Sequence, residues 1–342
     1  MKRKSIITGI NGPIVRAMGE ELSHAGMLEV VNVGEEELLG EIIHLDGETV
    51  IIQVFEDTGG LKAGDPVIRT FEPLSLHLGP GLLGNIYDGI QRPLRSIYEN
   101  GGDVMKRGDK TFALPQKKKW DFNPLVKKGD IVKEGCRLGE IKETKLINHF
   151  IMVPPGVNGI IKDIAVKGKY YISDIWALIE SEDDNRVEVK FYQKWPVRIG
   201  RPYQLKMDIT EPLITGQRII DSFYPIARGG SAALPGGFGT GKTMTQQALS
   251  KWSDADIVIY IGCGERGNEM TDVLMEFSRL IDLNSGEPLM ERTLLIANTS
   301  NMPVAAREAS IYTGITIAEY YRDMGYSVAL LADSTSRWAE AL

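Results

Sequence analysis

The chain has 342 residues, 43% hydrophobic and 25% charged, which is typical of a folded globular protein with two or three domains. Its formal net charge of −7 argues against a nucleic-acid partner, and its two cysteines cannot build a disulfide framework and fit a reducing cytosol. No apolar run approaches the ~18 residues of a membrane span, and the basic start precedes a stretch too short and polar for a signal peptide. Secreted, fibrous, disordered and membrane-spanning classes are therefore disfavoured.

Residues 1–70 predict a small N-terminal β-barrel. Short apolar runs are separated by turn residues such as Asn11-Gly12-Pro13 and Asp46-Gly47. The predicted strands cover 5–10, 28–33, 39–43 and 49–55.

Residues 71–110 predict a connection that leads into a second, nucleotide-binding domain. The segment is rich in proline and glycine around 78–85, and it becomes helix-like from Pro93 to Tyr98.

Residues 111–185 return to β patterning and predict an inserted β module. Two halves, near 126–139 and 153–168, repeat a strand, a Lys-Gly turn and a second strand. Such repetition resembles the sandwich barrels of biotinyl and lipoyl carrier domains. Carrier domains modify a lysine on a hairpin, whereas the stretch 146–150 between the halves has none. We therefore favour a docking surface over a carrier function.

Residues 186–342 predict an α/β nucleotide-binding domain. Apolar strands are expected at 257–261, 293–297 and 327–332, and continuous apolar strands alternating with helices indicate a parallel sheet covered on both faces. Helices are expected over 242–252, 269–281 and 305–324, with a last one beginning near Arg337.

The clearest motif is a phosphate-binding loop (P-loop) of the form G-x-x-x-x-G-K-T. Its glycines let backbone N–H groups turn inward around phosphate oxygens, and the following helix directs its N-terminal dipole to the same place. Lys242 is expected to reach the β- and γ-phosphates, and the Thr243 hydroxyl to bind Mg²⁺. The loop consists of Gly236, Gly237, Phe238, Gly239, Thr240, Gly241, Lys242 and Thr243.

Two further elements accompany the P-loop, and the second of them points to hydrolysis rather than binding alone. Asp333 ends an apolar strand, and beside a P-loop this is the Walker-B position, where the carboxylate holds Mg²⁺ through a water. Glu265 follows the strand after the P-loop helix, where a carboxylate can orient and polarise the attacking water. Arg266 could help to hold the γ-phosphate. Each carboxylate taken alone would be an ordinary strand-end or helix-cap residue.

Several signatures are absent. The chain has no N-K-x-D motif of guanine-specific GTPases and no H-R-D or D-F-G of protein kinases. The four histidines, at 24, 44, 77 and 149, do not have a metal-binding spacing. Cys263 is interpreted as a small packed residue rather than a nucleophile.

Four stretches together resemble the catalytic A (alpha) subunit of V-type and archaeal-type rotary ATPases. The resemblance covers essentially the whole chain, including the barrel and the inserted module, which is known in this family as the bulge. The F-type β subunit lacks that insertion, and the non-catalytic B subunit lacks the P-loop lysine that Lys242 supplies. The four stretches are 236–252, 262–270, 298–310 and 332–342.

The resemblance implies a function and a set of site residues. ATP or ADP with Mg²⁺ would be bound by the P-loop, with Thr243 and Asp333 at the metal and Lys242, Glu265 and Arg266 in catalysis. The chain would then hydrolyse or synthesise ATP and couple this turnover to H⁺ or Na⁺ transport. Alternatives are another hexameric P-loop ATPase, such as an export ATPase, and a non-catalytic fragment that serves assembly.

The resemblance also implies partners and a location. Three A and three B subunits would alternate in a ring, with an arginine finger from B, and central and peripheral stalks would connect the ring indirectly to a membrane sector. The chain would be cytoplasmic and peripheral to the membrane. Family members continue for a few hundred residues beyond the position of Leu342, with the adenine pocket and a helical C-terminal domain. The 342-residue chain alone is therefore expected to bind nucleotide weakly and to turn over little.

Overall fold

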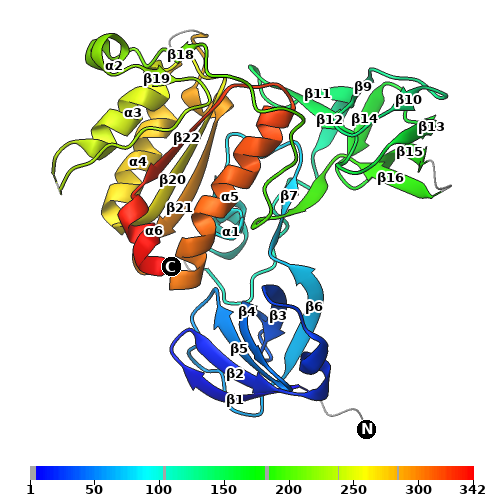
Figure 1. Cartoon of the computed structure of the whole chain (residues 1–342), viewed down its shortest axis with the longest axis vertical. Helices are drawn as coiled ribbons and strands as arrows, with labels where there is room; N and C mark the ends of the chain where they lie inside the picture. The colour runs from blue at the N-terminus through cyan, green and yellow to red at the C-terminus, as the bar shows by residue number, and fades with distance from the viewer. Residues whose placement is uncertain (1–4, 103–104, 182–184, 238, 283–284) are drawn as a thin grey trace.

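The computed structural model describes residues 5–102, 105–181, 185–237, 239–282 and 285–342. Figure 1 shows three bodies: a β-barrel that holds the N-terminus, a β-sandwich, and an α/β core that contains the C-terminus. This multidomain β plus α/β architecture is the fold class that the sequence predicts. Within the described ranges, every helix is too short or too polar to cross a lipid bilayer.

The N-terminal barrel is a six-stranded antiparallel sheet in the order β1-β2-β5-β4-β3-β6. A bridge between Ile6 and Pro66 brings the two edges together. Along β5 every second side chain (Val50, Ile52, Val54) is buried, which is the period of a strand with one face in a core. The elements are β1 Ile6–Asn11, β2 Ile14–Met18, the 3₁₀ helix η1 Glu20–His24, β3 Glu29–Val33, β4 Leu38–Asp46, β5 Thr49–Val54 and β6 Val67–Pro73.

The connection after the barrel contributes to both other bodies. Strand β7 (Ser75–Leu78) pairs with β17 (Gln193–Pro196), so the segment that leaves the barrel lies beside the segment that leaves the inserted module. Strand β8 (Ile86–Tyr87) adds a parallel edge strand to the central sheet, and helix α1 (Leu94–Gly101) follows it.

The inserted module packs two four-stranded sheets against each other, in the orders β12-β11-β9-β14 and β10-β13-β15-β16. Aromatic rings fill the space between them: Trp176 stacks on Phe191 with centroids 5.1 Å apart, and Phe122 meets Trp176 edge-on at 4.5 Å. The strands are β9 Lys119–Pro124, β10 Ile131–Val132, β11 Arg137–Lys142, β12 Asn148–Met152, β13 Gly159–Ile164, β14 Gly168–Tyr171, β15 Ile175–Ser181 and β16 Arg186–Lys190.

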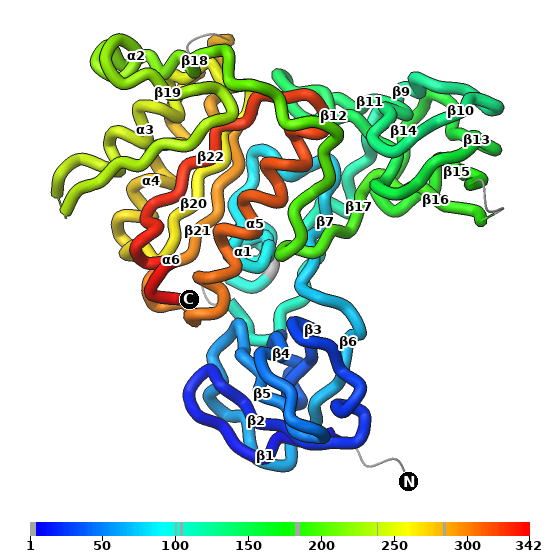
Figure 2. The backbone as a smooth tube through the Cα atoms, in the orientation of Figure 1, coloured from blue at the N-terminus to red at the C-terminus, as the bar shows by residue number. Residues whose placement is uncertain are grey.

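The α/β core is a parallel sheet in the order β22-β20-β21-β8. The central strands are apolar and buried on both faces, because α5 covers one face and α4 covers the other. Figure 2 shows α5 between this sheet and strands β7 and β17. The elements are α3 Lys242–Trp252, β20 Ile257–Glu265, α4 Gly267–Arg279, η2 Leu289–Arg292, β21 Thr293–Thr299, α5 Val304–Asp323, β22 Val328–Asp333 and α6 Thr335–Ala341.

These elements confirm the predicted strands and helices of the core to within two residues at each end, except at the end of β20. Strand β20 continues to Glu265 instead of ending at Ile261, because its pairing with β21 persists through Cys263 and resumes at Glu265. Glu265 therefore belongs to the strand, and its backbone is fixed by the sheet.

The segment between the module and the P-loop has little regular structure. It contains β18 (Pro212–Leu213), α2 (Arg218–Phe223) and β19 (Ile226–Ala227), and β18 pairs with β19 outside the central sheet. Large apolar side chains on it are exposed, among them Leu205, Met207 and Phe223.

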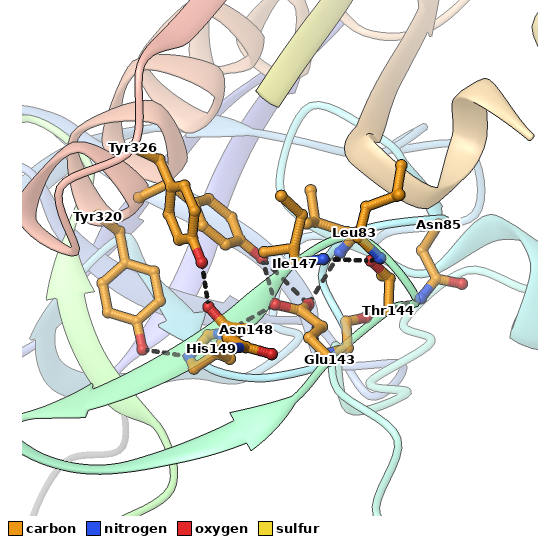
Figure 3. A network of polar contacts seen from close by, with 12 residues as sticks. Leu83, Asn85, Glu143, Thr144, Ile147, Asn148, His149, Tyr320 and Tyr326 are labelled. Atoms are coloured by element: carbon orange, nitrogen blue, oxygen red, sulfur yellow. Dashed lines mark hydrogen bonds and ion pairs between the residues drawn. The ribbon is translucent and has the colours of Figure 1, made fainter. Parts of the chain in front are cut away.

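A buried polar network joins the module to α5 (Figure 3). The Glu143 carboxylate accepts hydrogen bonds from the Gly81 and Leu83 N–H groups at 2.7 and 3.1 Å and from the Tyr321 hydroxyl at 3.0 Å. His149 lies between the two bodies, with Nδ1 2.7 Å from Glu143 and Nε2 2.9 Å from the Tyr320 hydroxyl. These contacts fix the C-terminal half of α5 against the module.

The same network controls the charge of Glu143. Burial by itself would raise the pKa of this carboxyl, but the attraction and hydrogen bond of His149 and the two N–H groups hold its pKa below the ordinary value. Glu143 is thus a buried carboxylate whose charge is compensated by partners from three segments.

Arg198 ties the barrel to α5 in a second place. Its guanidinium donates to Glu41 of β4 at 2.7 and 3.1 Å and to Glu308 of α5 at 2.7 Å. Burial would lower the pKa of Arg198, but the two carboxylates outweigh it and raise the pKa. Helix α5 is therefore held by the barrel near its first half and by the module near its end.

Candidate functional site

The P-loop leads directly into α3, whose first residue is Lys242. Gly241 caps the helix in the left-handed region at φ 82°, which glycine adopts without a steric cost. A Cβ at Gly236 would collide with the Thr240 hydroxyl, so the close turn there requires glycine as well. Phe238 lies outside the described residues.

The Lys242 ammonium group sits inside this loop. Its Nζ donates to the Gly236 and Gly237 carbonyls, both at 2.8 Å, while the loop itself is exposed. A cation at the mouth of a glycine-rich loop at a helix N-terminus is an arrangement that attracts phosphate.

Thr243 meets the end of β22. Its hydroxyl donates to Asp333 Oδ2 at 2.6 Å, although the two residues are 90 positions apart. The Tyr260 hydroxyl lies 3.3 Å from the same oxygen, and burial followed by the charge of Asp333 raises the pKa of this phenol, so it stays protonated. Asp333 is therefore a buried acceptor, only 2% exposed, with two hydroxyl groups on one oxygen.

This oxygen pair fits Mg²⁺. The cation prefers hard oxygen ligands, keeps several waters, and in phosphate sites is held by one or two protein oxygens plus the phosphates. Thr243 and Asp333 provide one hydroxyl and one carboxylate at adjacent positions. Among the described residues, no cluster of three or more His, Cys, Asp and Glu is arranged to hold a metal ion.

Glu265 stands at the end of β20, beside β22. Burial, a hydrogen bond with Glu269 and repulsion from Asp333 raise the pKa of its carboxyl to about 7, with Arg337 opposing the shift. A carboxylate that exchanges its proton near neutral pH is suited to general-base chemistry on water.

The structure places the predicted oxygen-bearing residues at one end of the sheet and Arg266 at the start of α4. Thr243, Asp333 and Glu265 share one edge of the sheet. Arg266 caps α4 and is largely exposed, and its guanidinium lies 3.9 Å from Glu269 within the same turn.

Three further residues belong to the site and are missed by motif reading. Tyr260 donates to Asp333, while Glu269 and Arg337 act on the charge of Glu265. Two of them could have been found from their positions in the sequence. Glu269 lies four residues after Glu265, and Arg337 lies four residues after Asp333. For Tyr260 the strand pattern carries no such signal, because its neighbours from Ile257 to Ile261 are all apolar.

Three parts of the chain match family models. Residues 7–70 match the beta-barrel domain of the ATP synthase alpha/beta family, and residues 111–198 match the ATP synthase alpha/beta subunit barrel-sandwich domain. Residues 216–342, which hold all the site residues, match the nucleotide-binding domain of the ATP synthase alpha/beta family.

Similar proteins agree with these matches. The chain is 60% identical over 339 residues to the A subunit of the A-type ATP synthase of Methanopyrus kandleri, covering 99% of this chain and 57% of that protein. It is 57% identical over 336 residues to the V-type ATP synthase alpha chain of Acetivibrio thermocellus, covering 98% of this chain and 56% of that protein. The chain thus spans a little over half the length of the curated relatives it matches.

A solved structure has the same fold. The assembled ATPase EscN from the type III secretion system of enteropathogenic E. coli superimposes with a TM-score of 0.62 and 21% sequence identity, covering 99% of this chain and 58% of that one. At this identity the likeness extends to the fold alone.

Proposed function

Because the chain belongs to the ATP synthase alpha/beta family, where its relatives are the A subunits of A-type and V-type ATP synthases, we propose that it is the catalytic, nucleotide-binding part of such a protein. It hydrolyses or synthesises ATP within a rotary complex that transports H⁺ or Na⁺. The observation that carries this proposal is the meeting of the P-loop threonine with Asp333 at 2.6 Å, beside a carboxyl whose pKa is about 7.

Each residue has a distinct role in this proposal. The loop N–H groups and Lys242 hold the β- and γ-phosphates, and Arg266 adds positive charge at the γ-phosphate. Thr243 and, through a water, Asp333 hold Mg²⁺, which neutralises phosphate charge when it is bound. Glu265 orients the attacking water and accepts its proton.

The partners proposed here are those that the resemblance to rotary ATPases implies, and they agree with the demands of phosphoryl transfer. A loose transition state spreads negative charge over the γ-phosphate oxygens, and a further cation in addition to Lys242 and Arg266 lowers its energy. We propose that this cation is an arginine finger from a neighbouring B subunit, in a ring where A and B subunits alternate. Central and peripheral stalks connect the ring to the membrane sector, which places the chain at the cytoplasmic side of a membrane.

The alternatives have less support. Relatives of 55–60% identity belong to ATP synthases, whereas the likeness to an export ATPase rests on 21% identity. A purely structural role in assembly does not require the contact of Thr243 with Asp333 or the raised pKa of Glu265.

The test is Glu265→Gln in the assembled complex that contains the full-length A subunit. Loss of the base is expected to lower ATP hydrolysis by at least about 100-fold, with binding of a fluorescent ATP analogue retained. Glu276→Gln, further along α4, is the matched control and keeps wild-type activity. Hydrolysis that survives Glu265→Gln would contradict the catalytic role, and a wild-type complex that assembles without hydrolysing ATP would favour the assembly function.

A further inference from the structure

The end of β20 contains an irregularity just before Glu265. Cys263 pairs with Asn298 of β21 and Glu265 pairs with the next residue, Thr299, so Gly264 is an extra residue in the ladder. Such a bulge bends a strand and redirects the side chain that follows it. Gly264 has φ 73°, in the region that favours glycine.

Two arginines enclose this glycine. A Cβ at Gly264 would lie 2.9 Å from Arg337 Cβ and 3.0 Å from both Cδ and Nε of Arg307. Any larger residue at this position would displace one of the two arginines or the bulge itself.

Arg307 also holds the residue that follows β21. Its Nη2 donates to the Ser300 carbonyl at 2.9 Å, and the Ser300 N–H donates to the Glu265 carbonyl at 2.8 Å. On the other side, the Cys263 thiol lies 3.6 Å from the Arg307 carbonyl. Arg307, in the first turn of α5, is thus linked to the residues on both sides of Gly264.

One hydrogen-bond donor of the Arg307 guanidinium has no acceptor among the described residues. Its Nε is buried and has no hydrogen-bond partner in the part of the chain that the structure describes. An arginine that leaves a donor buried against a glycine contributes through its shape and its bond to Ser300 rather than through an ion pair at that atom.

We propose that Arg307 and the bulge at Gly264 together position the Glu265 side chain for catalysis. The bulge sets the direction of the Glu265 side chain, and Arg307 prevents the bulge from relaxing. The inference rests on the proposed function and deepens it, since Arg307 acts through Glu265. A displacement of about 1 Å at a catalytic group can cost about 100-fold in rate, so small movements of this bulge matter.

The test measures kcat and nucleotide affinity separately in the assembled complex with the full-length A subunit. Arg307→Met removes the bond to Ser300 and is expected to lower kcat about 10–100-fold, with the affinity for a fluorescent ATP analogue changed less than about 2-fold. Gly264→Ala is expected to do the same, because its Cβ displaces the arginine. Arg322→Met, at the far end of α5, is the control and keeps wild-type kcat.

A double variant separates positioning from general stability. In the Glu265→Gln background, Arg307→Met should add no more than about 2-fold to the loss, because the residue it positions is already disabled. Arg307→Lys keeps the positive charge but lacks the planar guanidinium group, and it should give an intermediate kcat. If Arg307→Met does not assemble, the same measurements are made on Arg307→Lys.

Three outcomes overturn the inference. A wild-type kcat in Arg307→Met, while Glu265→Gln is inactive, would show that Glu265 needs no such support. Parallel losses of nucleotide affinity and kcat would assign Arg307 a structural role, and so would losses that add in the double variant. Activity retained by Glu265→Gln itself would overturn the proposed function first, which distinguishes the two failures.

Discussion

At the scale of single residues, replacing Lys242 is expected to have the clearest effect on nucleotide binding. Its ammonium group lies on the Gly236 and Gly237 carbonyls at the mouth of the loop, where it can exchange these carbonyls for phosphate oxygens. Lys242→Gln is expected to weaken binding of a fluorescent ATP analogue about 10–100-fold, the value of a hydrogen bond to a charged group. Lys251→Gln, at the end of the same helix, is the control, and equal affinities of the two variants would argue against phosphate binding by Lys242.

Ionisation of the Glu265 carboxyl should destabilise the folded state. Its pKa rises from an ordinary 4.5 to about 7, so the native state keeps the proton more tightly than the unfolded state, and stability is lost as the pH rises from about 4.5 through 7. Glu265→Gln removes this penalty and should stabilise the chain by about 1 kcal/mol at pH 8, after allowance for solvent screening of a half-exposed group. Thermal unfolding at pH 8 and pH 5 measures it. If Glu265→Gln stabilised the chain equally at pH 8 and at pH 5, the cause would be something other than ionisation of Glu265.

At the scale of elements, the important unit is α5 with the strands that it contacts. The network of Glu143, His149, Tyr320 and Tyr321 buries a carboxylate between the helix and the module. Because its partners are all donors, the network holds α5 only while Glu143 is ionised.

Glu143→Gln is therefore expected to be strongly destabilising. An amide would direct an N–H group at donors and leave His149 without its carboxylate, which costs about 3–5 kcal/mol for a broken buried pair. Denaturant unfolding measures this loss, with Glu140→Gln on β11, the strand that ends just before Glu143, as the control. A loss below about 1 kcal/mol would mean that the network contributes little.

The pH dependence of this element has the opposite sign to that of Glu265. The pKa of Glu143 is lowered in the native state, so its contribution is present above the unfolded value of 4.5 and is lost as the pH falls through the native value. The wild-type minus Glu143→Gln difference in unfolding free energy should accordingly shrink in acid.

At the scale of the whole molecule, Arg198 links the barrel to the α/β core. It joins Glu41 of the barrel to Glu308 of α5. Arg198→Met leaves two carboxylates without their shared cation, and we expect the barrel to separate more readily from the core. Limited proteolysis should then cut between the barrel and β7 faster than in the wild type. Arg186→Met on the exposed part of β16 is the control, and unchanged cleavage would assign the coupling to other contacts.

Much of the architecture was accessible from local pattern. The bounds of α3 agree with the predicted 242–252, and α4 and α5 agree to within two residues, because amphipathic periodicity and turn residues act over a few positions. The P-loop and the two strand-end carboxylates were also identifiable, since each motif lies within eight consecutive residues or at the end of one apolar run.

What the tertiary structure alone decided are the contacts between distant segments. The 2.6 Å bond of Thr243 to Asp333, the entry of β8 into the central sheet, and the packing of Arg307 behind Gly264 join residues that no local pattern connects. The physical reason is that helix and strand propensities depend on near neighbours, whereas the direction of a catalytic side chain depends on which strands pair and what packs behind them. The sequence by itself determined the chemical groups of the site, and the packing of α5 and β22 against β20 decided where they meet.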